Sequence, residues 1–393
     1  MLTSLAFIFL LGMSLGAIFK KLKLPSLLGM LITGIILGPY ALNWLDDSIL
    51  SISADLRQLA LIIILTRAGL ALDIKDLKKV GRPAILMCFI PACFEIAGMI
   101  LIAPKLLNIS ILDAAIMGTV IAAVSPAVIV PKMLHLMETK YGMNKSIPQL
   151  IMAGASVDDV FVIVLFTAFT GLAQGEQISP MSFVQIPISI IFGLIIGILI
   201  GIILSAVFKK LHLRDSAKVI IILSISFLLV AIEQSLKGIV PFSGLLAVMS
   251  LGAALQKNHF DLSKRLSDKF SRLWVGAEVL LFVLVGATVD IKYSILAGFS
   301  AIIVILGVLI FRMAGVFFCM IKTKLTIKER LFCMIAYMPK ATVQAAIGSI
   351  PLTLGLSCGP IVLTVAVLSI LITAPLGALG IDMTYKSFLT RGE

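Results

Sequence analysis

Long runs of hydrophobic residues, separated by short polar links, fill almost the whole chain. Each run approaches or exceeds the roughly 20 residues that an α-helix needs to cross the hydrocarbon core of a bilayer. The pattern predicts an all-α polytopic membrane protein with no separate soluble domain. We expect about thirteen transmembrane helices on this reading, centred near residues 3–19, 26–43, 52–72, 83–103, 110–130, 148–173, 181–208, 218–236, 238–256, 272–289, 293–321, 331–355 and 359–380.

The composition agrees with this pattern. Of the 393 residues, 60% are hydrophobic and only 13% are charged, whereas soluble domains carry roughly 25% charged residues. The mean hydropathy is +1.15. The first hydrophobic run is followed at once by others, so we interpret it as a retained helix and not as a cleaved signal peptide.

Positive charge is distributed unevenly between the two sets of alternating links. Most of the 32 Lys and Arg residues lie in one set, and the opposite set holds only Lys105, Lys237 and Lys292. Cytoplasmic loops of membrane proteins carry the excess of Lys and Arg. We therefore expect the N-terminus outside and the C-terminus in the cytoplasm, with the protein in the cell membrane. The net charge of +12 follows from this bias, and we expect no nucleic-acid partner.

An internal repeat is visible in the sequence. The segment 69–75 resembles 286–292, which lies 217 positions later, and the isolated charges Glu95 and Arg312 are separated by the same 217 positions. By the charge rule, the first segment ends a helix inside and the second ends one outside. Opposite orientation is what inverted-topology repeats require. We expect two inverted five-helix repeats, near residues 26–173 and 238–380.

The fourth helix of each repeat contains a proline at its centre. Pro126 follows Ser125 in the first repeat, and Pro339 precedes Lys340 in the second. Proline removes a backbone donor and clashes with the preceding turn, and the freed backbone groups need protein, water or an ion as partners. Interrupted helices at corresponding positions of two repeats indicate a transporter binding site. We predict two crossing broken helices here.

Two adjacent acids, Asp158 and Asp159, lie in the run that ends the first repeat, with no other charge between Lys145 and Glu176. A carboxylate at bilayer depth costs roughly 2.5–3.5 kcal/mol even on insertion scales. Neighbouring residues of a helix point about 100° apart, so the two acids face different surroundings. Two charges ~4 Å apart repel by ~4 kcal/mol at an effective dielectric of about 20, so the pair titrates as a unit. A buried acid that exchanges a proton for a small cation is the minimum chemistry of a cation/proton antiporter.

Three further charges are isolated in hydrophobic runs: Glu95, Arg312 and Lys340. Leaving any of them buried without a partner is costly. We expect Glu95 to pair with Arg312, which joins the third helices of the two repeats. For Lys340 there are two arrangements, one with Asp158 and the other with Glu95.

Several of these segments resemble the cation:proton antiporter superfamily. They are Ser156-Val-Asp158-Asp159, the break at 123–126, the stretch 66–73 and Met338-Pro-Lys-Ala-Thr-Val-Gln-Ala-Ala346. Within that superfamily the chain is most similar to NHA-type sodium/proton antiporters of the double-aspartate group. The resemblance covers nearly the whole chain.

This resemblance implies an NhaA-like antiporter fold and a homodimer. It implies a moving core near residues 83–173 and 293–380, and a dimerisation scaffold near 1–72 and 181–290. Asp159 corresponds to the main ion-binding acid and Asp158 to its partner. Many double-aspartate members carry a lysine where this chain has Arg312. Because arginine does not readily release a proton, we expect Arg312 to be a structural member of an ion pair.

We therefore interpret the chain as a secondary active Na+ or Li+/H+ antiporter working by alternating access, with no cofactor and no enzymatic activity. The expected ion ligands are Asp158, Asp159, Ser125 and Ser156. The alternative is a sodium-coupled symporter of an organic anion with the same architecture, although no additional polar cluster for such a substrate is present. An intramembrane aspartyl protease fits less well, because its two acids share a proton across different helices. A gated channel is a further alternative.

Overall fold

The computed structural model describes residues 1–71, 81–174, 180–211, 213–235 and 242–392. The described residues form helices and contain no β-strand, and only an isolated bridge joins Tyr141 to Arg391. A helix satisfies its own backbone hydrogen bonds, which a chain in hydrocarbon must do. Among these residues, nine helices are long and apolar enough to cross a membrane.

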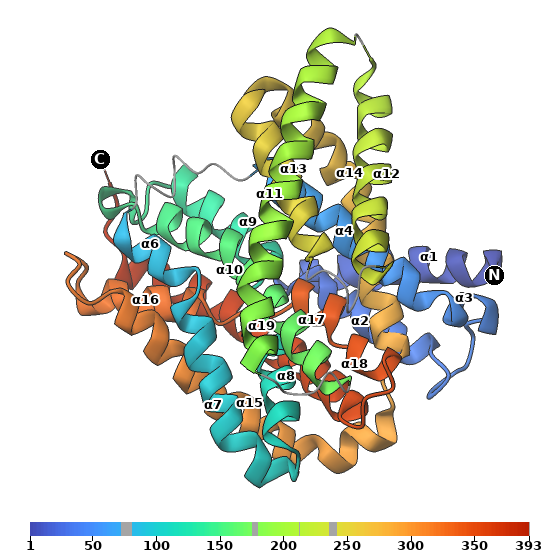
Figure 1. The fold of residues 1–393 in the computed structure, drawn as a ribbon. Helices are drawn as coiled ribbons and strands as arrows, with labels where there is room; N and C mark the ends of the chain where they lie inside the picture. Colours follow the sequence, from blue (N-terminus) through green and yellow to red (C-terminus); the bar gives the residue numbers. More distant parts are fainter. Residues whose placement is uncertain (72–80, 175–179, 212, 236–241, 393) are drawn as a thin grey trace. The chain divides into compact units, whose positions relative to one another are not determined.

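The chain separates into two compact units, and Figure 1 labels their helices. The first comprises residues 1–54, 75–173 and 279–393, and the second comprises residues 55–74 and 174–278. Most of the second unit is made by α4 (Ser53–Ala71), α11 (Pro180–Lys210), α12 (Asp215–Ser235) and α13 (Gly244–Asn258), and the unit boundary falls within α14 (Phe260–Ala287). The first unit holds α1 (Leu2–Lys21), α2 (Ser26–Leu37), α3 (Asp47–Ser51), α6 (Arg82–Met87), α7 (Ile90–Leu107), α8 (Ile111–Ala122), α9 (Pro126–Glu138), the 3-10 turn η1 (Met143–Lys145), α10 (Ile147–Ala173), α15 (Ile291–Cys319), α16 (Ile327–Ala336), α17 (Thr342–Ile347), α18 (Ile350–Thr353) and α19 (Gly359–Phe388).

The helix boundaries differ from the sequence prediction, most clearly at two places. The run 83–103 is divided between α6 and α7, because Pro91 in the first turn of α7 lacks the N–H that would continue the preceding helix. Helix α14 begins at Phe260 instead of near residue 272. Its charged first turns are a helical extension and not a loop, since basic and acidic side chains spaced three or four apart support an exposed helix.

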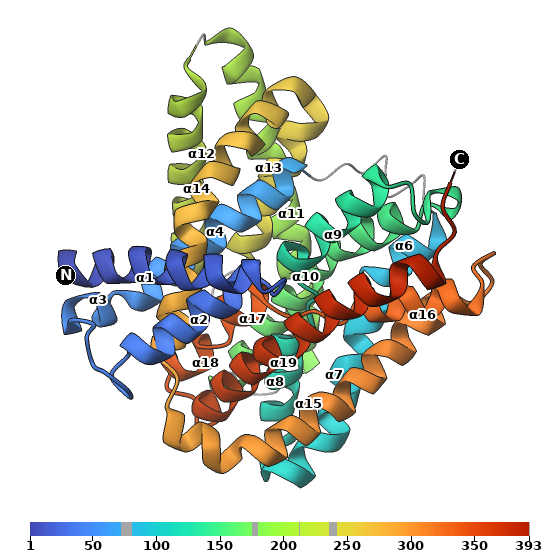
Figure 2. The same cartoon turned by 180° about the vertical axis from the view of Figure 1, so that it is seen from behind.

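Helices α7 and α15 lie side by side in the first unit, as Figures 1 and 2 both show. Small residues allow this close packing. A β-carbon at Gly98 of α7 would lie 2.6 Å from the ring of Phe311 on α15. This contact brings Glu95 of α7 and Arg312 of α15 to facing positions.

Both predicted interruptions are present. Helix α8 ends at Ala122 and α9 begins at Pro126, while α16 ends at Ala336 and α17 begins at Thr342. The two interruptions touch, because the backbone N–H of Ser125 donates to the carbonyl of Pro339 at 2.8 Å. Two non-helical backbone segments therefore meet inside the first unit.

Candidate functional site

Helix α10 carries the acid pair to this meeting point. Asp158 is completely buried, whereas Asp159 is partly exposed. One carboxylate oxygen of Asp158, Oδ2, accepts the backbone N–H of Val124 in the first break at 2.8 Å. The same oxygen accepts Nη2 of Arg312 at 3.1 Å. The two acids thus have different surroundings, as their positions on a helix require.

Arg312 closes the ends of both interrupted helices. Its Nε donates to the carbonyl of Tyr337, just after α16, at 2.8 Å. Its Nη1 donates to the carbonyl of Ala122 at the end of α8, and to Oε2 of Glu95 at 2.6 Å. Helix C-termini carry partial negative charge and carbonyls without intrahelical partners. One guanidinium, with five donors in a fixed fork, therefore donates hydrogen bonds to two helix ends and two carboxylates.

Lys340 forms its ion pair with Glu95 and not with Asp158. Its Nζ is 2.6 Å from Glu95 Oε2, and both side chains are buried. Its backbone N–H donates to Oγ1 of Thr373 on α19 at 2.9 Å. Of the two arrangements open from the sequence, the structure therefore contains the second, and Asp158 has Arg312 as its basic neighbour.

Sequence reasoning missed Gln344, which joins the two breaks. Its Oε1 accepts the N–H of Ala341 at 2.7 Å, and its Nε2 donates to the carbonyl of Ala123 at 2.8 Å. The interruptions leave both backbone groups without helical hydrogen-bond partners. The amide side chain of Gln344, which has one donor end and one acceptor end, replaces the missing helical bonds. The signal in the sequence was an amide residue in the hydrophobic run that follows Pro339.

The remaining predicted residues lie around the same point. Pro126 is the first residue of α9, and Pro339 accepts the Ser125 N–H. The hydroxyls of Ser125 and Thr342 are 3.4 Å apart. The side chain of Ser156, also predicted as an ion ligand, lies outside the described part of the structure.

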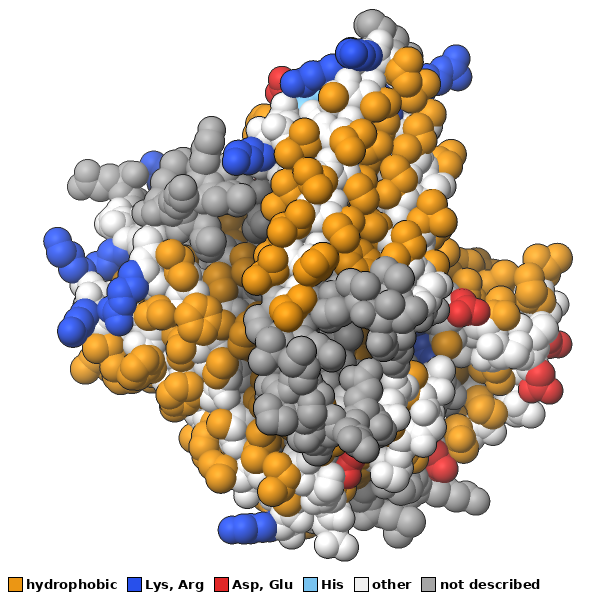
Figure 3. All heavy atoms as spheres, in the orientation of Figure 1, with side chains coloured by type: hydrophobic (Ala, Val, Ile, Leu, Met, Phe, Trp, Pro, Cys, Tyr) orange, Lys and Arg blue, Asp and Glu red, His pale blue; other side chains and the backbone are white. Residues whose placement is uncertain are grey.

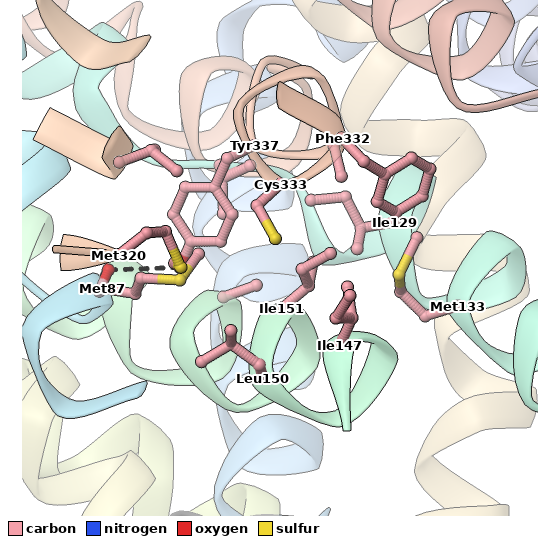
Figure 4. Close-up of a cluster of buried hydrophobic side chains, with 14 of the residues drawn as sticks. Met87, Ile129, Met133, Ile147, Leu150, Ile151, Met320, Phe332, Cys333 and Tyr337 are labelled. Carbon is pink, nitrogen blue, oxygen red and sulfur yellow. Dashed lines mark hydrogen bonds between the residues drawn. The ribbon is translucent and has the colours of Figure 1, made fainter. Parts of the chain in front are cut away.

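A hydrophobic cluster supports the site from one side (Figure 4). Tyr337 is fully buried in it, and its hydroxyl donates to the carbonyl of Met87 at 3.2 Å. The Arg312 guanidinium lies 5.2 Å from the centre of the Tyr337 ring. Gly154 makes room for this ring, because a β-carbon there would lie 2.6 Å from the tyrosine oxygen. The aromatic ring thus holds the guanidinium against the breaks.

The family follows from comparison with known proteins. The sequence profile described as "Sodium/hydrogen exchanger, transmembrane" matches residues 5–386. The chain belongs to this family. A relative named "Sodium/hydrogen exchanger 9B2" from Mus musculus is 33% identical over an alignment of 405 positions, which covers 96% of this chain and 72% of the mouse protein. "Sodium/hydrogen exchanger 9B1" from Homo sapiens is 30% identical over 384 residues, covering 94% and 73%.

A solved structure shows the same fold as this exchanger-family chain. The sodium proton antiporter MjNhaP1 from Methanocaldococcus jannaschii superposes with a TM-score of 0.87, at 22% identity, covering 100% of this chain and 99% of that one. The family profile and the relatives confirm the cation:proton antiporter family that the sequence motifs indicate, and the structural likeness confirms the all-helical fold.

In this family member, each acid of the pair has one buried oxygen that is open for a ligand. Oδ1 of Asp158 and Oδ1 of Asp159 accept no hydrogen bond from any residue that the structure describes. A buried carboxylate oxygen without a donor is costly. A proton or a small hard cation removes that cost, and both bind to carboxylate oxygen.

Proposed function

We propose that this protein is a secondary active antiporter that exchanges Na+ or Li+ for H+ across the cell membrane. The observation that supports this most is the pair of open Oδ1 atoms on Asp158 and Asp159, beside two touching helix breaks. Membership of the sodium/hydrogen exchanger family agrees with it. Proton and cation compete for the same oxygens, so occupancy by one excludes the other.

The two acids have different roles in this proposal. Asp158 is held by Arg312 and by the Val124 N–H, so its Oδ2 is a fixed part of the charge cluster. Asp159 is partly exposed and is the acid that exchanges its ligand. Asp158 Oδ1 and the hydroxyl groups of Ser125 and Ser156 complete the cation ligands.

Transport proceeds by alternating access. A cytoplasmic cation displaces the proton from Asp159, the loaded core moves, and the cation leaves outside, where a new proton binds. Arg312 and Lys340 neutralise Glu95 and Asp158 inside the first unit throughout the cycle. Because this four-charge cluster is neutral when the four groups are ionised, the ligand on Asp159 decides the net charge that moves.

The helices belong to two inverted five-helix repeats in this proposal. The pairs Glu95 with Arg312 and Ser125 with Thr342 each join residues 217 positions apart, the same offset that relates the repeated sequence segments. A residue touches its own counterpart only near the axis that relates two copies. These contacts support a repeat axis that passes through the two breaks. The hydrophobic runs support about thirteen membrane crossings. The distribution of Lys and Arg supports an N-terminus outside and a C-terminus in the cytoplasm.

We also propose a homodimer in which the helices near 1–72 and 181–290 form the scaffold and those near 83–173 and 293–380 form the moving core. The concentration of buried charges on α7, α10, α15 and the two breaks supports the placement of the core. Charges that share one rigid group of helices can move together without losing their partners.

Purified protein in liposomes with an imposed pH gradient tests this function. We expect Na+ and Li+ to dissipate the gradient, and choline to leave it unchanged. A gradient insensitive to every alkali cation would contradict antiport. Sodium uptake that requires an organic anion, without proton counterflow, would identify the symporter instead. Clamping the membrane voltage in the same assay gives the charge moved per cycle.

A further inference from the structure

A hydrophobic groove of about 410 Å³ opens at the surface of the first unit, and neither acid of the pair lines it. Its walls come from α7, α15 and α16, and they include Phe94, Ile310, Met313, Ala314, Phe317 and Met334. Ile310 is 67% exposed and Phe317 40% exposed. Almost all of the accessible lining is apolar, so the groove suits a hydrocarbon chain.

Two arginines each contact a residue that lines this groove. Arg82 donates to the carbonyl of the lining residue Ile321 at 3.3 Å, and the Arg330 guanidinium lies 5.8 Å from the centre of the Phe317 ring. Among the described residues neither arginine has an acidic partner within ion-pair distance. Nε of Arg330 is buried and donates to none of these residues either. The guanidinium groups therefore retain N–H donors without partners beside the hydrophobic groove.

We propose that this groove binds one anionic phospholipid, with an acyl chain along α15 and the headgroup phosphate on Arg82 and Arg330. Arginine forms strong, bidentate hydrogen bonds to phosphate, and basic pockets between transmembrane helices bind anionic headgroups. The arginines belong to the links rich in Lys and Arg, so the headgroup lies in the leaflet on that side. Figure 3 shows hydrophobic side chains over α7 and α15 and basic side chains at the end where α6 and α16 lie.

The bound lipid would pack against the helix pair that carries the charge cluster. Phe94 directly precedes Glu95 on α7, and Met313 directly follows Arg312 on α15. Lipid on the outer surface of these helices therefore favours the packing that brings Glu95 and Arg312 together. The site lies beyond the exchange chemistry, and it gives membrane composition a route to the stability of the core.

Thermal unfolding of the full-length protein in detergent tests this site. Dioleoylphosphatidylglycerol and dioleoylphosphatidylcholine have the same acyl chains and differ in headgroup charge. We expect the anionic lipid to raise the Tm more than the neutral one. The R82Q/R330Q double variant removes the headgroup contacts and A314F fills the groove, so each should lose this difference.

Two matched variants control for loss of charge and for added bulk. Lys105→Gln removes an exposed cation at the other end of α7, and Ile303→Phe enlarges an exposed residue of α15 outside the groove; both should keep the difference. If R82Q/R330Q does not fold, native mass spectrometry of the unchanged protein and A314F decides, because only the former should retain phosphatidylglycerol. Equal stabilisation by both lipids, or an unchanged preference in A314F, would overturn the proposal. A change of oligomeric state in A314F would assign the groove to a second copy of the chain and would also overturn it.

Discussion

Arg312 donates from Nη2 to Oδ2 of Asp158 at 3.1 Å, and both side chains are buried. The same guanidinium binds the carbonyls that end α8 and α16. The position of one acid of the pair is therefore tied to the geometry of both helix breaks. Asp159, one residue further, has no such contact among the described residues and keeps an open oxygen.

Replacement of Arg312 should destabilise the fold severely. Arg312→Gln removes the positive charge between Glu95 and Asp158, and breaking a buried ion pair costs about 3–5 kcal/mol. Arg312→Lys keeps the charge, but a single nitrogen cannot reach two carbonyls and two carboxylates together. We expect a lower Tm for both variants, with the glutamine variant lower. Arg265→Gln, which breaks an exposed pair with Asp215, is the control and should change stability by about 0–1 kcal/mol.

Glu95 and Lys340 should be energetically coupled. Glu95→Gln leaves two cations against Asp158, and Lys340→Gln leaves two acids against Arg312, so each single change unbalances the buried charge. The double variant restores balance. We expect it to be more stable than the sum of the single effects predicts, by about 0.5–3 kcal/mol. Additive losses in a double-mutant cycle of Tm or denaturant stability would show that the 2.6 Å contact carries no coupling.

Gln344→Leu should loosen both breaks. The change leaves the Ala341 N–H and the Ala123 carbonyl without their partner, and each unsatisfied buried group costs about 1–3 kcal/mol. We expect a lower Tm and faster hydrogen exchange at the backbone amides of residues 340–342. Gln149→Leu, at a partly exposed position near the start of α10, is the matched control. Normal protection of the backbone amides of residues 340–342 in Gln344→Leu would refute this role.

An ion pair on the basic side should give acid sensitivity. Burial opposes ionisation of Glu329, but hydrogen bonds from Lys145 and the Thr326 N–H hold its pKa below the ordinary value. A lowered folded-state pKa stabilises the fold fully above the ordinary carboxyl pKa of about 4.3. That stabilisation is lost as the pH falls through the lower, folded-state pKa. The Tm gap between the unchanged protein and Glu329→Gln should therefore be present at pH 7 and shrink towards pH 3. A Tm gap that does not change with pH would contradict this prediction. Asp268→Asn, which changes an exposed acid, is the control and should show no such pH-dependent gap.

Isolated charges in hydrophobic sequence located the site because burial forces such groups together. That argument identified Glu95, Asp158, Arg312 and Lys340, and the two prolines located the breaks. It did not decide the partner of Lys340, since the choice between two carboxylates depends on the path of the backbone after Pro339. The close approach of α7 and α15 places Glu95 within reach of both cations.

Neutral and backbone partners could not be predicted in the same way. Gln344 and Tyr337 resemble ordinary polar residues of membrane helices, and the carbonyls of Ala122 and Tyr337 have no side-chain signature. The division between α6 and α7 had a signal in Pro91, which a count of hydrophobic residues ignores. The charged start of α14 could not be recognised from hydrophobic runs alone. A helix that continues beyond the hydrocarbon core can carry charged side chains, so its charged turns look like a polar link in the sequence.

Asp159→Asn tests the central claim most directly. Asparagine keeps the size of the side chain but cannot exchange a proton for a cation, so we expect sodium-dependent proton movement in everted vesicles to fall to the level of vesicles without the protein. The Tm should remain close to that of the unchanged protein, because Asp159 makes no contact in the charge cluster of the described residues. Asp261→Asn, an exposed acid on α14, should retain exchange. Sodium-dependent proton movement at the unchanged rate in Asp159→Asn would contradict the account.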